Sequence, residues 1–110
     1  MRFIHKNLAR GRWFRFSLFE QMANIGSEVE RAISWRKKGD LKYNQEAFKR
    51  ALDLIDLTLR SPYLRRRLKE IARLREVLCD YFVFDNLYKT TDEALKKYFS
   101  AFTMASRKNK

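Results

Sequence analysis

Apolar residues recur at steps of three and four along most of this chain, and this spacing constrains the fold more than any other feature. Between Ser61 and Phe84 the recurring positions are Leu64, Leu68, Ile71, Leu74, Leu78 and Phe82. Such spacing lays one apolar stripe along a helix. Three further segments show the same spacing, so the sequence predicts an all-α protein, an up-down-up-down four-helix bundle with short links.

Capping motifs predict the first two helices. Ser17 and Glu20 have the S-x-x-E spacing of a capping box, which predicts a helix over about Leu18–Lys38. Asn44 is the predicted cap of a second helix over about Gln45–Arg60.

Two further motifs predict the remaining helices. Ser61 and Pro62 suit the cap and the first position of a third helix, and Pro62 cannot continue the preceding one. Thr90 and Glu93 have the spacing of a second capping box, which predicts a fourth helix that ends near Ser106.

For four residues within these helices, the sequence predicts whether they are buried or exposed and what they contact. Gly26 costs about 1 kcal/mol relative to Ala, so we expect a neighbouring helix to approach it closely. Glu28 lies near the apolar seam, and a rim position is favoured over a buried, paired one. Asp53 and Asp56 are expected on the outer edge of their helix, solvated or paired with arginines.

The charge is large and unevenly placed. The 110 residues hold 25 Lys and Arg against 13 Asp and Glu, a net charge of +12. We divide the chain into a basic aromatic arm over 1–16, a bundle over 17–106 and a basic tail over 107–110. This charge predicts salt-dependent attraction to nucleic acid or to an anionic membrane.

The arginine run at the start of the third predicted helix points to an anion. A helix N-terminus carries partial positive charge and disfavours each cation there by about 0.3–1 kcal/mol. If only stability mattered, the first turn would therefore hold Asp or Glu and not arginine. The predicted nucleic-acid contacts combine this region with the aromatic arm, in which rings could stack on bases. These residues are Arg65, Arg66, Arg67, Lys69, Arg73, Arg10, Arg12, Trp13, Phe14 and Arg15. Solvation of the basic strip and docking of the arm's rings onto the bundle remain alternatives.

Few residues suit catalysis or metal binding. Cys79 is the one cysteine and His5 the one histidine. The expectation is therefore no metal, no cofactor, no catalytic residue and no enzyme activity. A single cysteine is consistent with the reducing cytoplasm, which is the expected location. Because no apolar run is long enough to span a membrane, we expect no integral membrane association. Residues 1–16 could instead form a membrane-surface segment or a targeting sequence.

Sixteen aromatic residues are many for one small core. Trp35, Tyr43, Tyr63 and the rings of the arm are therefore candidates for an exposed patch, which predicts a homo-oligomer.

A short, basic four-helix bundle resembles two groups of proteins. One is encoded in intervening sequences of bacterial ribosomal RNA genes; the other comprises accessory proteins of diversity-generating retroelements. The resemblance lies in architecture and charge, covers residues 17–106, and transfers no site residue. It implies an oligomeric partner of RNA and of a reverse transcriptase. The segments MANIGSEVERAISW and LREVLCDYF also resemble a set of small microbial helical proteins, which implies no function.

These features favour a non-enzymatic nucleic-acid-binding bundle, RNA before DNA, with little sequence preference. The alternative is an adaptor that binds an acidic partner protein such as a polymerase. Attachment to a membrane surface through residues 1–16 is a third possibility.

Overall fold

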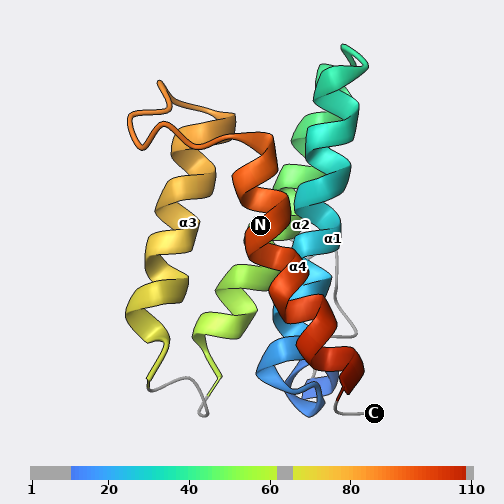
Figure 1. The fold of residues 1–110 in the computed structure, drawn as a ribbon, viewed down its shortest axis with the longest axis vertical. Coiled ribbons are helices and arrows are strands. Elements are labelled where there is room, and N and C mark those ends of the chain that lie inside the picture. The colour runs from blue at the N-terminus through green and yellow to red at the C-terminus, as the bar shows by residue number, and fades with distance from the viewer. Residues whose placement is uncertain (1–10, 62–65, 109–110) are drawn as a thin grey trace.

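The computed structural model describes residues 11–61 and 66–108, which form four α-helices (Figure 1). They are α1 (Leu18–Lys37), α2 (Leu41–Leu59), α3 (Leu68–Phe82) and α4 (Asp92–Lys108), and a 3-10 helix, η2 (Trp13–Arg15), precedes α1. No strand occurs within the described residues. The predicted all-α class and the four helices are confirmed.

The helices are not packed equally. Helix α1 packs against both α2 and α4, whereas α3 packs mainly against α2. Figure 1 shows the α1–α2 turn and the α3–α4 loop at one end of the molecule, which we call the upper end. The start of α1, the end of α2, the start of α3 and the end of α4 lie at the lower end.

The core follows the predicted apolar stripes. The core residues that lie on these stripes include Met22, Ile25, Val29, Ala51, Ile55, Ile71, Leu74, Leu78, Leu95, Phe99 and Phe102. Cys79 and Phe82 are partly buried and pack against this core. Leu68, predicted to lie on the stripe of the third helix, is instead 49% exposed, because α3 only begins there. Leu64 lies outside the described residues.

Gly26 allows α1 and α4 to meet closely, as predicted. A Cβ atom at this position would lie 2.7 Å from Cβ of Phe99, a distance that carbon atoms do not tolerate. Phe99 is 2% exposed and therefore fixed by its surroundings. The absence of a side chain at Gly26 thus sets the separation of the two helices.

The start of α1 matches the prediction, and that of α2 does not. Ser17 and Glu20 form the predicted capping box, with both hydrogen bonds present. Helix α2 begins at Leu41, because Asp40 accepts a hydrogen bond from the Tyr43 N–H and so caps the helix four residues early. Asn44 is not a cap. It is buried and donates to the carbonyl of Ala32 at 2.7 Å.

The predicted start of the third helix is wrong. Helix α3 has Arg67 at its N-cap, and Arg66 and Arg67 form a turn before it. The predicted first residue, Pro62, lies outside the described residues, as do Tyr63 and Arg65. The N–H of Ser61 donates to the carbonyl of Thr58 and so continues the end of α2.

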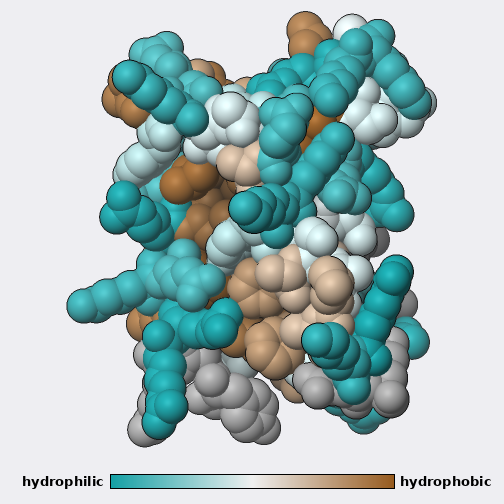
Figure 2. All heavy atoms as spheres, viewed as in Figure 1, coloured by the Kyte–Doolittle hydropathy of each residue, from teal (hydrophilic) through white to brown (hydrophobic). Residues whose placement is uncertain are grey.

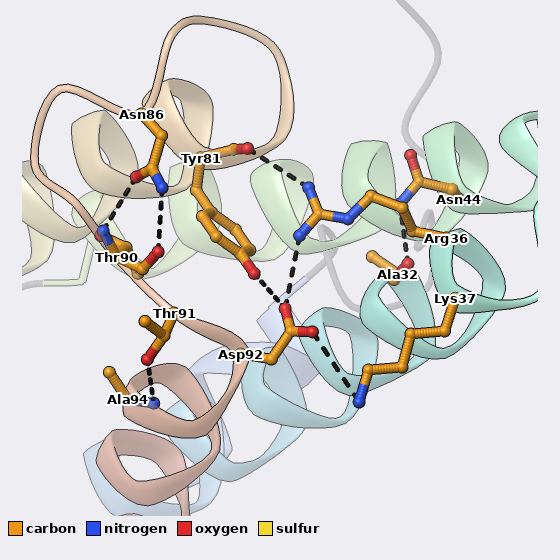
Figure 3. A network of polar contacts seen from close by, with 10 residues as sticks. All are labelled: Ala32, Arg36, Lys37, Asn44, Tyr81, Asn86, Thr90, Thr91, Asp92 and Ala94. Carbon is orange, nitrogen blue, oxygen red and sulfur yellow. Dashed lines mark hydrogen bonds and ion pairs between the residues drawn. The ribbon is translucent and has the colours of Figure 1, made fainter.

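Helix α4 is shifted from its predicted bounds at both ends. Thr91, one residue after the predicted cap, accepts a hydrogen bond from the Ala94 N–H. Thr90 precedes this cap, and its backbone N–H and carbonyl both bond to the side chain of Asn86 (Figure 3). The helix continues to Lys108, so the first two residues of the predicted tail are helical.

Two of the carboxylates are buried, contrary to prediction. Glu28 is 4% exposed and binds the guanidinium groups of Arg31 and Arg50, so the favoured rim position is wrong. Asp53 is also 4% exposed and does not lie on the outer edge. Asp56 pairs with Arg75 at 2.8 Å, as predicted, and this hydrogen bond raises the pKa of Arg75.

Within the described residues, the predicted aromatic patch is only partly exposed, and Tyr63 lies outside them. Trp35 is half-buried and packs on Tyr43 with a centroid distance of 4.8 Å, and Tyr43 is 46% exposed. Trp13 is in the core. Among the described residues, exposed large apolar side chains gather instead in the α3–α4 loop: Val83, Phe84, Leu87 and Tyr88.

A polar network joins three helices at the upper end (Figure 3). Arg36 of α1 donates to the carbonyl of Tyr81 and to Oδ1 of Asp92, both at 3.3 Å, and lies over the Tyr81 ring. Lys37 lies 3.8 Å from the other oxygen of Asp92. The Tyr81 hydroxyl donates to Asp92 as well. Partial burial, followed by this hydrogen bond, raises the pKa of Tyr81 to about 12.

In the described part of the chain, no helix has the length and apolar character needed to cross a membrane.

We expect Gly26→Ala to destabilise the protein, although Ala is the better helix former by about 1 kcal/mol. Overpacking against Phe99 costs about 1–3 kcal/mol and should exceed that gain. Urea unfolding measures the change. Ser27→Ala, at the exposed neighbouring position, is the control and should be nearly neutral. A Gly26→Ala variant more stable than the wild type would contradict the close approach.

Alkaline pH should weaken the network around Tyr81. The folded chain holds the phenol proton to about pH 12, whereas an unperturbed tyrosine releases it near 10.0. The contribution of this group to stability is therefore complete below pH 10.0 and lost as the pH rises through about 12. In urea unfolding across this range, Tyr81→Phe should lose less stability than the wild type. Tyr43→Phe, which alters a tyrosine outside the network, is the control and should lose as much stability as the wild type. If Tyr81→Phe also lost as much stability as the wild type between pH 10.0 and about 12, the proton of Tyr81 would not contribute to stability.

Candidate nucleic-acid interface

The lower end of the molecule gathers positive charge from segments far apart in the sequence. Its residues, 11–20, 57–61, 66–70 and 104–108, hold eight cations: Arg12, Arg15, Arg60, Arg66, Arg67, Lys69, Arg107 and Lys108. The same residues hold two carboxylates, Glu20 and Glu70. All eight cations except Arg67 are classed as exposed. The helix directions therefore build a strongly basic surface, which we call the basic end.

The upper end is electrically balanced. Its residues, 36–43 and 80–93, hold five cations: Arg36, Lys37, Lys38, Lys42 and Lys89. They also hold five carboxylates: Asp40, Asp80, Asp85, Asp92 and Glu93. The high net charge is thus polarised along the long axis of the molecule.

Some cations of the basic end have structural reasons for their positions. Arg60 follows α2, and Arg107 and Lys108 end α4, where the helix dipole favours positive charge. Arg67 is partly buried, lies over the rings of Phe19 and Phe102 at 5.9 and 5.5 Å, and is 3.9 Å from Glu70. Arg67 therefore anchors the start of α3 to the rest of the protein, a role that sequence reasoning missed.

Other cations have no such compensation. Arg66 and Lys69 are exposed beside the N-terminus of α3, where the dipole disfavours them. Arg12 and Arg15 are exposed on either side of a buried residue, Trp13. These four side chains project into solvent from the basic end and can contact an anion.

Trp13 is not placed to stack on a base. It is 1% exposed, its Nε1 donates to Oγ1 of Thr58 at 3.1 Å, and its carbonyl accepts from the Gln21 side chain. Phe14 is partly buried and packs against the core. For these two rings the structure supports the docking alternative.

The predicted basic strip on α3 is divided. Arg66 and Lys69 lie at the basic end, whereas Arg73 lies further along α3, over the ring of Tyr88 at 5.5 Å. Arg10 and Arg65 fall outside the described residues. Arg107 and Lys108 of the predicted basic tail lie at this end as well. The structure adds Arg60, which the alternating directions of the four predicted helices could have placed at the same end as the start of α3.

A surface pocket of about 430 Å³ lies beside these cations, where the chain passes from η2 into α1. Its lining includes Phe14, Arg15, Ser17 and Ser61. Within residues 11–61 and 66–108, no three His, Cys, Asp or Glu side chains come together in a group that could hold a metal ion.

Comparison with protein-family models, curated proteins and solved structures gives no match. The resemblance in architecture and charge therefore stays an expectation.

Arg66 and Arg67 should differ in their effect on stability although they are neighbours. Arg67→Ala removes two ring contacts and should destabilise the protein by about 0.5–1 kcal/mol. Arg66→Ala should be neutral, or stabilising by up to about 1 kcal/mol, because it relieves an unfavourable charge near the helix N-terminus. Urea unfolding of the two variants tests this difference, and equal losses would show that Arg67 is not an anchor.

Proposed function

We propose that this protein is a non-enzymatic nucleic-acid-binding domain that contacts phosphates through its basic end. The observation that carries the proposal is the convergence of eight cations against two carboxylates at one end, while the other end is balanced. Net charge alone would attract polyanions to any face. A polarised charge gives the phosphate backbone one preferred face.

The chemistry at the basic end favours phosphate over other anions. Arginine guanidinium groups form paired hydrogen bonds with phosphate oxygens. Besides Arg67, the basic end has seven cations, and five of them are arginines that lie on four segments, which a long backbone can span. Contacts to phosphate position a protein on nucleic acid without reading sequence. Binding should therefore show little sequence preference and should accept RNA, the favoured ligand, and DNA.

In this proposal the four helices form an up-down-up-down scaffold, and residues 11–16 contribute Arg12 and Arg15 to the basic end. Up-down-up-down order matters because it returns every second chain connection to the same end. The proposal needs no cofactor and no catalytic group.

Salt dependence provides the first test. If the basic end neutralises about six phosphates, the slope of log affinity against log salt should be about −4 to −5, at 0.7–0.9 per phosphate. Filter binding with single-stranded RNA, duplex RNA and duplex DNA of mixed sequence measures it. A slope near zero would exclude the proposal.

Two matched variants test the location. One replaces Arg12, Arg15, Arg66 and Lys69 with Gln, and the other replaces the exposed Lys42, Lys49, Lys89 and Lys96. Both lose four positive charges, but only the first alters the basic end. The first should reduce the salt slope by about 3, and the second by less than about 1.

Equal losses in the two variants would show that net charge, and not the basic end, determines binding. If the wild type binds none of the three nucleic acids, the adaptor hypothesis replaces this proposal. A partner protein retained after nuclease treatment and in high salt would then support it.

A further inference from the structure

The α3–α4 loop presents a cluster of exposed apolar side chains. Leu87 is 81% exposed, Phe84 70%, Val83 58% and Tyr88 47%. Figure 2 shows apolar side chains at this corner of the molecule as well as between α3 and α4. Exposing apolar surface is unfavourable, and clusters of this kind mark contact surfaces.

The loop backbone is held in one conformation. The carboxylate of Asp80, 7% exposed, accepts hydrogen bonds from the N–H groups of Leu87 and Tyr88 at 2.8 and 3.0 Å. Asn86 has φ +53° and bonds through its side chain to both backbone groups of Thr90 at 2.9 Å. The apolar side chains are therefore presented by a rigid loop, which lowers the entropy cost of binding.

An apolar groove of about 290 Å³ lies next to this loop, between α3 and α4. It exists because α3 packs mainly on α2 and leaves its side toward α4 open. Leu74, Val77, Ala94, Leu95 and Tyr98 line it, with Glu70 and Arg73 at its edge. The Tyr98 hydroxyl donates to Glu70 at 2.6 Å. An apolar cavity of about 150 Å³ holds a benzene ring, so the groove can accept a phenylalanine side chain.

Charge distinguishes this surface from the rest of the chain. Residues 70–98, which build the groove and the loop, hold five cations (Arg73, Arg75, Lys89, Lys96 and Lys97). They hold six carboxylates (Glu70, Glu76, Asp80, Asp85, Asp92 and Glu93). This region is therefore nearly neutral in a protein of net charge +12. A strongly basic partner, including a second copy of the chain, meets no repulsion here.

We propose that a second copy of this chain docks on this surface, with the loop of each copy in the α3–α4 groove of the other. Such a contact is self-complementary, as two-fold symmetry requires. The loop lies at the upper end, and the groove extends below it along α3 and α4. Each loop reaches the groove of the other copy only if the two-fold axis runs perpendicular to the helices, which makes the two copies antiparallel.

The antiparallel arrangement also keeps the two basic ends apart. The longest dimension of one copy is 35 Å, and the basic ends lie at opposite poles of the pair. Their separation then exceeds the Debye length of about 8–10 Å at ordinary salt, so their repulsion is screened. The dimer would present two basic ends, but its formation does not depend on nucleic-acid binding.

Sedimentation velocity on the nuclease-treated protein tests the dimer. At about 1 M NaCl, the Debye length is about 3 Å, so contacts between the protein and nucleic-acid phosphates are screened. Association through apolar surfaces is not weakened by salt in this way. The wild type should sediment as twice its 13.4 kDa mass. The double variant Phe84→Asp, Leu87→Asp should raise the dimer dissociation constant at least about 100-fold. Leu41→Asp, 64% exposed but outside this surface, should leave it unchanged.

Cross-linking tests the orientation in a Cys79→Ala background. Under oxidising conditions, Leu87→Cys chains mixed with Ala94→Cys chains should form a disulfide-linked pair, and neither variant should do so alone. Cross-linking of Leu87→Cys with itself would overturn the loop-in-groove arrangement. A wild type that stays monomeric, or equal dissociation by Leu41→Asp, would overturn the proposal and leave the surface to a different partner. None of these outcomes bears on the nucleic-acid proposal.

Discussion

The close contact between Gly26 of α1 and Phe99 of α4 is the constraint on which the arrangement of the helices depends. Because Gly26 has no side chain, Phe99 packs directly on the backbone of α1, and α4 is held against α1. Helix α1 also packs against α2. Helix α3 is left to pack mainly on α2, and the open side between α3 and α4 becomes the apolar groove.

The polar interactions follow the same division. At the upper end, Arg36, Tyr81 and Asp92 join α1 to the end of α3 and the start of α4, which fixes both sides of the long loop. At the lower end, Arg67 makes the corresponding contact over Phe19 and Phe102. One end is therefore crosslinked by balanced charges, whereas the other keeps an excess of exposed cations.

Local sequence signals predicted local structure well. The Ser17–Glu20 capping box, the apolar stripes and the need for close packing at Gly26 depend on neighbouring residues or helix periodicity, and all are present. The prediction of the start of α2 failed because two caps competed. Asp40 replaced Asn44 because it follows Gly39, whose positive φ of 78° ends α1 and places Asp40 as the next available acceptor.

The sequence by itself determined the all-α class, the four amphipathic segments and the amount of positive charge, because periodicity and composition are properties of the chain. Only the tertiary structure decided which charges meet. The eight cations of the basic end come from four segments, and their convergence depends on helix direction and length. Burial of Trp13 and Glu28 was likewise decided by tertiary packing, since hydrogen-bond and ion-pair partners distant in sequence offset the cost of removing polar groups from water.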